Sequence, residues 1–363
     1  MNIFGKITGI RYKIFFDENL KEVDINNFDI NSAPSSCLLK DNNYNFAISK
    51  WVSPKRTRSY PFERVYNTLN NSKRITVIPI VKDEGENGDR DFLQWDTISL
   101  MSLLDVYVIF AYYESAEKSN QKIKNQKFNN DFIISKIKEI EQYHSSALHW
   151  NLNELNTNLH FLIDNVKDSY SKIEKIMGVK LHNPRGLDNF KNRIGEDVSL
   201  FMDFSRGKAE KAQSREFVTV QPKESLSTST KAKITITNYL GGQYFFTVDE
   251  INITNNKVIL LESKHSKKSI LPSKSDIKDG LLKMILYSNL TDVSLNRKKI
   301  KSEAVLCLTS TKLKGEILSN SKEKDISTFF QKNKFKEIQI KLINTIFKEA
   351  NNNNFIIKIK HSK

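Results

Sequence analysis

Two acidic residues and a lysine in the C-terminal third have the types and spacing that phosphodiester hydrolysis requires. Asp249 is followed, after twelve intervening residues, by Glu262 and then, two positions on, by Lys264. If the asparagines at 255 and 256 form a two-residue hairpin loop, Asp249 faces Glu262 across two antiparallel strands. Lys264 then lies two residues further along the same face, and Glu250 points to the opposite face.

Two carboxylates that face each other repel unless a cation lies between them, and hard oxygen ligands select Mg²⁺, with Mn²⁺ as a substitute. Such a cation polarises a phosphoryl oxygen and lowers the pKa of bound water. A neighbouring lysine can position the attacking water and stabilise charge in the transition state. The pattern therefore predicts Asp249 and Glu262 as metal ligands and Lys264 as a third catalytic residue.

The surrounding residues predict the elements that would position this site. Residues 232–239 alternate between apolar and polar side chains, as a half-buried strand does, and a helix pattern follows the third strand with Ser275 as its N-cap. The predicted order is strands at 232–239, 244–250 and 257–264, a helix at 276–289, a strand at 302–309, helices at 325–331 and 335–350, and a strand at 355–360.

The rest of the chain divides by composition into three further regions. Residues 1–128 mix strand-like runs and loops, including a strand at 74–81 in which Pro79 indicates a sheet edge or a bulge. Residues 129–212 have helical periodicity, with one helix over 152–177 that ends at Gly178 and another over 187–201. Residues 213–231 are rich in Ser, Thr and Lys and predict a linker or mobile arm. The predicted class is α/β (α+β), with a mixed sheet flanked by helices in residues 232–363.

The charge balance favours a polyanionic partner. The 363 residues carry 57 Lys and Arg against 42 Asp and Glu, a net charge of +15. From Lys257 to Lys301 there are eleven basic residues and four acidic ones, so the excess is concentrated around the candidate site. Candidate DNA-backbone contacts are Lys267, Lys268, Arg297, Lys298 and Lys299, and a recognition loop is predicted at Lys55, Arg56 and Arg58.

Two features bear on the compartment. Lys6, Arg11 and Lys13 interrupt any apolar N-terminal segment, so we expect no signal peptide. The longest apolar run, residues 98–113, contains Asp105 and is shorter than a membrane span. We expect a cytoplasmic protein without membrane contact, and the abundance of Lys, Asn and Ile favours an AT-rich bacterial genome.

Asp249 with Glu262 and Lys264 on adjacent strands, followed by a helix and a strand, resembles the PD-(D/E)xK nuclease superfamily and, within it, the type II restriction endonucleases. The resemblance covers roughly residues 232–310. It departs from the common pattern at Val248, where many members have proline. Lys283 and Tyr287 have the spacing of a glutamine-x-x-x-tyrosine pattern, with Lys in place of Gln.

The resemblance implies a restriction-endonuclease-like core and Mg²⁺-dependent, sequence-specific cleavage of double-stranded DNA. It also implies a homodimer and a cognate DNA methyltransferase. Two rival hypotheses remain open. One is a repair or anti-phage nuclease of the same superfamily without a fixed target sequence. The other is a basic nucleic-acid-binding protein in which the hairpin is purely structural.

Overall fold

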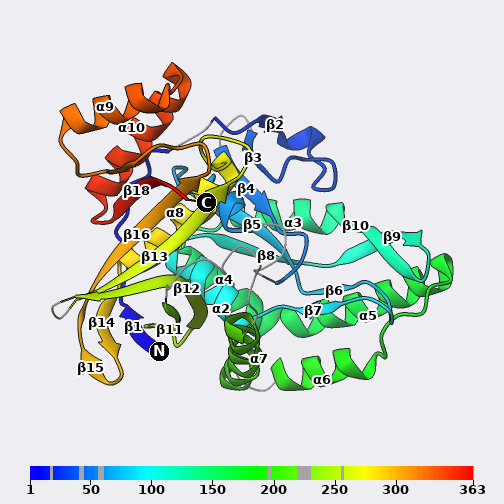
Figure 1. The fold of residues 1–363 in the computed structure, drawn as a ribbon. Coiled ribbons are helices and arrows are strands. Elements are labelled where there is room, and N and C mark those ends of the chain that lie inside the picture. The colour runs from blue at the N-terminus through cyan, green and yellow to red at the C-terminus, as the bar shows by residue number, and fades with distance from the viewer. Residues whose placement is uncertain are drawn as a thin grey trace. The chain divides into compact units, whose positions relative to one another are not determined.

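The structure, a computed structural model, describes residues 1–16, 19–40, 45–55, 61–194, 198–218, 230–254 and 257–362. It is mixed α/β, and the chain divides into two compact units (Figure 1). Unit 1 comprises Met1–Glu18 and Lys208–Lys363, and unit 2 comprises Asn19–Gly207. Among the described residues, no helix combines the length and the apolar character needed to cross a membrane.

Unit 1 is built on a nine-stranded mixed sheet in the order β15-β14-β1-β11-β12-β13-β16-β18-β17. Its elements are β1 (Asn2–Ile7), β11 (Thr230–Asn238), β12 (Gln243–Thr254), β13 (Lys257–Ser266), α8 (Lys274–Ser288), β14 (Thr291–Leu295), β15 (Lys298–Lys299), β16 (Lys301–Ser310), β17 (Glu316–Leu318), α9 (Glu323–Asn333), α10 (Glu337–Asn352) and β18 (Ile356–His361). Strands β11, β12 and β13 are successive antiparallel neighbours, whereas β13, β16 and β18 run parallel.

Helix α8 packs on β13 and β16, and α10 packs on β18 (Figure 1). Parallel strands need crossover connections, and here α8 lies between β13 and β16 in the chain while α9 and α10 lie between β16 and β18. Leu306 and Leu308 of β16 and Ile357 of β18 are fully buried. The sheet and these helices therefore enclose one apolar core, beside which the candidate site lies.

Unit 2 contains a five-stranded sheet in the order β2-β3-β4-β5-β8 and two two-stranded sheets, β6-β7 and β9-β10. Its elements are β2 (Glu22–Asp24), the 3₁₀ helix η1 (Ile25–Asn27), β3 (Ser36–Lys40), β4 (Asn45–Lys50), α1 (Pro61–Tyr66), β5 (Lys73–Pro79), β6 (Val81–Asp83), β7 (Arg90–Phe92), α2 (Trp95–Leu103), β8 (Tyr107–Ala111), β9 (Tyr113–Ser119), β10 (Lys122–Phe128), α3 (Asn130–Glu141), α4 (Ala147–Thr157), α5 (Leu159–Met177) and α6 (Arg185–Ile194). Helix α7 (Val198–Val218) contains the division between the units.

Several local predictions differ from the structure. The strand predicted at 74–81 is present as β5 and the start of β6, but β5 lies inside the sheet, between β4 and β8. Pro79 is tolerated because it is the last residue of β5. The helix predicted over 152–177 is broken at Asn158 into α4 and α5, and Gly178 caps α5 at φ 58° as predicted. The helix predicted over 187–201 is divided between α6 and α7, with residues 195–197 outside the described part.

The predicted arm at 213–231 and the predicted region 1–128 also have different boundaries in the structure. The arm predicted at 213–231 begins inside α7, which continues to Val218, and ends inside β11; residues 219–229 lie outside the described part. The first strand, predicted as part of a 1–128 region, pairs in parallel with β11 of unit 1. Ile3 and Ile7 are fully buried there. A pairing between strands so far apart in the chain leaves no mark on local periodicity.

Candidate active site

The register of β12 and β13 brings Asp249 beside Glu262. Glu250 pairs with Leu261, and the following pairs continue regularly to Thr254 with Lys257. This is the predicted register, although the loop at 255–256 lies outside the described residues. At the other end of the ladder, just beyond the pair of Glu250 with Leu261, the backbone N–H of Ser263 donates to Oδ2 of Asp249 at 2.8 Å. Asp249 is therefore fixed next to the backbone that carries Glu262.

An irregularity in β12 coincides with Asp249. Ala232 of β11 pairs with Val248 and Thr230 pairs with Ile251, so β12 advances by three residues while β11 advances by two. The extra residue lies at Asp249–Glu250 and makes a β-bulge, a feature that often re-aims side chains next to active sites. Here the bulge adjoins the point where the Asp249 side chain accepts the amide of β13.

Helix α8 brings a second lysine and a third carboxylate to the same face. The helix begins after Ser273, whose hydroxyl accepts from the N–H of Asp276, so the N-cap is Ser273 rather than the predicted Ser275. Asp279 and Lys283 are four residues apart and lie on one side of the helix. That side packs on β13, the strand that carries Glu262 and Lys264.

The four charged groups form a chain of short contacts. Oε1 of Glu262 accepts from Nζ of Lys283 at 2.7 Å and lies 3.0 Å from Nζ of Lys264. Nζ of Lys264 also donates to Oδ2 of Asp279 at 2.6 Å. The Glu262 side chain is 2% exposed, and the two lysine side chains are 14% and 19% exposed. These contacts therefore lie largely away from water, where charges interact strongly.

Gly280 allows α8 to approach the sheet this closely. A Cβ atom added at Gly280 would lie 2.6 Å from Cδ1 of Leu306 and 3.4 Å from Cε of Lys264. Leu306 is fully buried, so it has little room to move. The absence of a side chain at this helical position thus keeps space for both the core leucine and the catalytic candidate Lys264.

The electrostatics of the two acidic residues differ. Burial, and then the negative charge of Glu262, raise the pKa of Asp249 to about 6. Burial also acts to raise the pKa of Glu262, but Lys283 and Lys264 outweigh it and hold that pKa below its usual range. At neutral pH both carboxylates are therefore largely ionised, and three carboxylates face two ammonium groups when Asp279 is included.

Oxygen atoms at this site fit a hard divalent cation. Within the described part of the chain, Oε2 of Glu262 is buried and has no hydrogen-bond partner. An unsatisfied buried carboxylate oxygen is costly, and a cation shared with Asp249 would satisfy it and relieve the repulsion between the two carboxylates. No cluster of three or more His, Cys, Asp or Glu side chains suited to a metal occurs in the described ranges.

The predicted DNA-contact residues come from both units of the chain. Lys267 and Lys268 are exposed and directly follow β13, close to Lys264 in the chain. Lys55 belongs to unit 2, where Nζ lies 3.4 Å from the buried Asp91; Arg56 and Arg58 lie outside the described residues.

Arg297, Lys298 and Lys299 are exposed and span the turn from β14 into β15. Lys301, just after them, pairs with Lys257 at the start of β13, seven residues from Lys264. At about 3.3 Å per residue, that places this basic group roughly 23 Å along the strand from the site. The structure therefore separates it from the carboxylates, and Lys267 and Lys268 are the nearer candidates for a phosphate contact.

Sequence reasoning missed Asp279 and assigned no contact to Lys283. Both lie in the run Asp279-Gly280-Leu281-Leu282-Lys283, where charged residues interrupt an otherwise apolar, buried helix. A charged residue inside such a helix needs a partner, and the four-residue spacing places both partners on one face. The two charged residues in a buried helix could therefore have indicated a site, but the identity of their partners depends on how α8 packs on β13.

Comparison with known proteins adds no identification: no family model matches the chain, and neither a curated protein nor a solved structure matches it.

Proposed function

We propose that this protein is a Mg²⁺-dependent endonuclease that cleaves double-stranded DNA at specific sequences, as a type II restriction endonuclease does. The observation that carries the proposal is the convergence of Asp249, Glu262 and Lys264 on one face of β12 and β13, with Oε2 of Glu262 lacking a partner among the described residues. The basic surplus around the site supports a polyanionic substrate.

In this proposal Asp249 and Glu262 hold the cation, with Mn²⁺ as a possible substitute. When bound there, such a cation would supply Lewis-acid chemistry, polarising a phosphate oxygen and lowering the pKa of water. Lys264 positions that water and stabilises the negative charge that develops on the phosphoryl oxygens. Asp279, which accepts from Nζ of Lys264 at 2.6 Å, holds the lysine in place. Burial of these groups excludes bulk water and strengthens each electrostatic contact.

Further parts of the proposal rest on the resemblance to restriction endonucleases. They are a restriction-endonuclease-like core around β12, β13, α8 and β16, a homodimer that cuts both strands, a bacterial cytoplasmic location, and a partner methyltransferase that protects host DNA. Unit 2, which contains Lys55, is the candidate for target recognition in this scheme.

One observation favours a non-catalytic alternative. Lys283 and Lys264 already place two positive charges on Glu262, so the network also serves as a buried structural ion pair. In that case the protein would bind DNA through its basic surface without cutting it.

Digestion of a plasmid of known sequence, with Mg²⁺ and with EDTA, tests the proposal. Discrete fragments whose sequenced ends share a motif support a restriction endonuclease. A smear of fragments with unrelated ends supports the repair or anti-phage alternative. Intact plasmid under all conditions supports the binding protein.

A further inference from the structure

Lys283 occupies an unusual position for a second lysine at a metal site. It projects from α8 onto Glu262 and donates to Oε1 at 2.7 Å. Its side chain is 19% exposed, and the carboxylate that it meets is 2% exposed. Oε1 is one of only two oxygens that Glu262 can offer to a cation. The ammonium group of Lys283 therefore occupies one carboxylate oxygen, while Oε2 has no hydrogen-bond partner among the described residues.

The other lysine differs from Lys283 in its anchoring. Lys264 contacts Oε1 of Glu262 at 3.0 Å but makes a shorter contact, 2.6 Å, to Asp279. If Lys264 moves away from Glu262, its ammonium group still has the carboxylate of Asp279 as a partner. Lys283 is the closer of the two lysines to Glu262, at 2.7 Å from Oε1 against 3.0 Å for Lys264.

We infer that Lys283 acts as a built-in counter-cation that competes with a metal ion for the charge of Glu262: its ammonium group, held on Oε1, repels a cation bound at Oε2 and so weakens metal binding. This inference rests on the proposed metal-dependent function. A divalent ion and an ammonium group within reach of one carboxylate repel each other, and burial makes that repulsion strong. The protein is therefore stable without metal and binds metal weakly. A purely structural lysine would instead support the site, and its loss would not improve metal binding.

Calorimetric titration of Mn²⁺ into the full-length protein tests this competition. Lys283→Gln keeps a hydrogen-bond donor near Glu262 but removes the charge, and we expect Mn²⁺ to bind at least tenfold more tightly than to the wild type. Lys283→Arg keeps the charge and should bind Mn²⁺ as weakly as the wild type. Lys274→Gln removes an exposed lysine from the first turn of the same helix and is the matched control, with unchanged affinity expected.

The outcomes separate the two proposals. Equal Mn²⁺ affinity of the wild type and Lys283→Gln, or weaker binding by the variant, overturns the competition and leaves the nuclease proposal standing. Absence of Mn²⁺ binding in every variant overturns both. If Lys283→Gln does not fold alone, Mn²⁺ present during refolding should restore the native fold, because it replaces the missing charge. Failure of Mn²⁺ to restore it, with the wild type refolding normally, overturns the competition.

Discussion

The Asp249 carboxylate accepts a hydrogen bond from the backbone N–H of Ser263 at 2.8 Å, and so lies beside the neighbour of Ser263 in the chain, Glu262. This contact converts two acidic residues with twelve residues between them into a pair. It also places Asp249 where burial and Glu262 raise its pKa to about 6. A pair of ionised carboxylates in this setting is unfavourable for folding and favourable for binding a cation.

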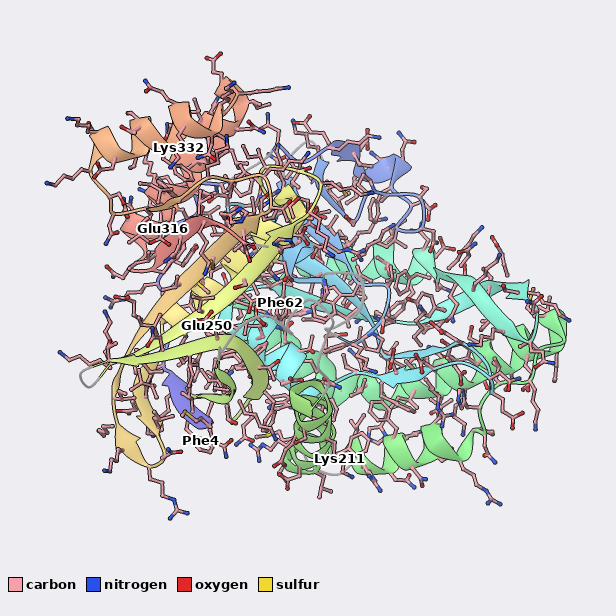
Figure 2. The ribbon with its side chains drawn as sticks, in the orientation of Figure 1. Phe4, Phe62, Lys211, Glu250, Glu316 and Lys332 are labelled. Carbon is pink, nitrogen blue, oxygen red and sulfur yellow. The ribbon has the colours of Figure 1, made fainter. Side chains whose placement is uncertain are left out.

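Asp249→Asn, compared with Glu250→Gln, should distinguish the loss of a metal ligand from the loss of any negative charge on β12. Asp249→Asn keeps an acceptor for the Ser263 amide but removes a negative charge, so Mn²⁺ affinity and DNA cleavage should both drop steeply. Glu250→Gln is the control, because Glu250, labelled in Figure 2, is the next residue of β12 and pairs with Leu261, not with Glu262. Its metal affinity and activity should stay within a few-fold of the wild type. An inactive Glu250→Gln beside an active Asp249→Asn would show that the ligand is misassigned.

Loss of the Lys264 ammonium should leave metal binding intact and slow the chemistry. Lys264→Ala removes a positive charge close to Glu262, so calorimetry should show Mn²⁺ binding at least as tight as in the wild type. Single-turnover cleavage should slow by roughly 10²–10³-fold, the usual cost of losing a transition-state donor. Lys324→Ala, which instead removes an exposed lysine from α9, should cut at close to the wild-type rate. A Lys264→Ala variant that cuts equally fast would remove this lysine from the mechanism.

The raised pKa of Asp249 predicts how stability depends on pH. Between about pH 4 and 6 the folded protein keeps a proton that the unfolded chain has already lost, so this group lowers folding stability as pH rises through that window. Asp249→Asn removes the effect. Urea unfolding should show the variant gaining about 2–3 kcal/mol relative to the wild type between pH 4 and pH 7. A difference that stays constant across this range would contradict the raised pKa.

The same pKa predicts the pH dependence of metal binding. A carboxylate ligand must be ionised, so Mn²⁺ affinity of the wild type should fall as pH drops below about 6 and level off above it. Titrations from pH 5 to pH 8 measure this directly. Affinity that stays level across this range would remove Asp249 from the ligand set.

Gly280 should tolerate no side chain. Gly280→Ala places a methyl group against the buried Leu306 and close to Lys264, so thermal or urea unfolding should show a loss of about 1–3 kcal/mol despite the better helix propensity of alanine. Gly207 lies in α7, where an added Cβ meets no described atom within 4 Å outside the local backbone of that helix, and Gly207→Ala should gain about 0.5–1 kcal/mol. Equal effects at the two positions would show that α8 does not approach the sheet as described.

The hairpin and its register were predictable because they depend on local alternation and a short turn. Glu250 pairs with Leu261 as the spacing required, and the main strands and helices from residue 232 onward lie close to their predicted positions. The pairing of β1 with β11, the break at Asn158 and the short strands β14, β15 and β17 were not predicted. They depend on contacts between distant segments, or on elements too short to have a period.

The site was predictable for the residues that share one hairpin and not for those that come from α8. Asp249, Glu262 and Lys264 follow from a two-residue repeat along β12 and β13. Asp279 enters only because α8 packs against β13, and the partner of Lys283 depends on the same packing. The bulge at Asp249 was also invisible, because a single extra residue in one strand leaves the apolar pattern nearly unchanged.

Cleavage of supercoiled plasmid by the wild type and by Glu262→Gln, each with Mg²⁺ and with EDTA, tests the central claim most directly. Glu262 has a buried oxygen, Oε2, without a hydrogen-bond partner among the described residues and contacts both lysines, so every part of the proposed chemistry depends on it. The account predicts that the wild type cuts only with Mg²⁺ and that Glu262→Gln, folded as judged by circular dichroism, leaves the plasmid intact. Cleavage by Glu262→Gln at the wild-type rate, or a wild type that leaves the plasmid intact with Mg²⁺ and with Mn²⁺, would contradict it.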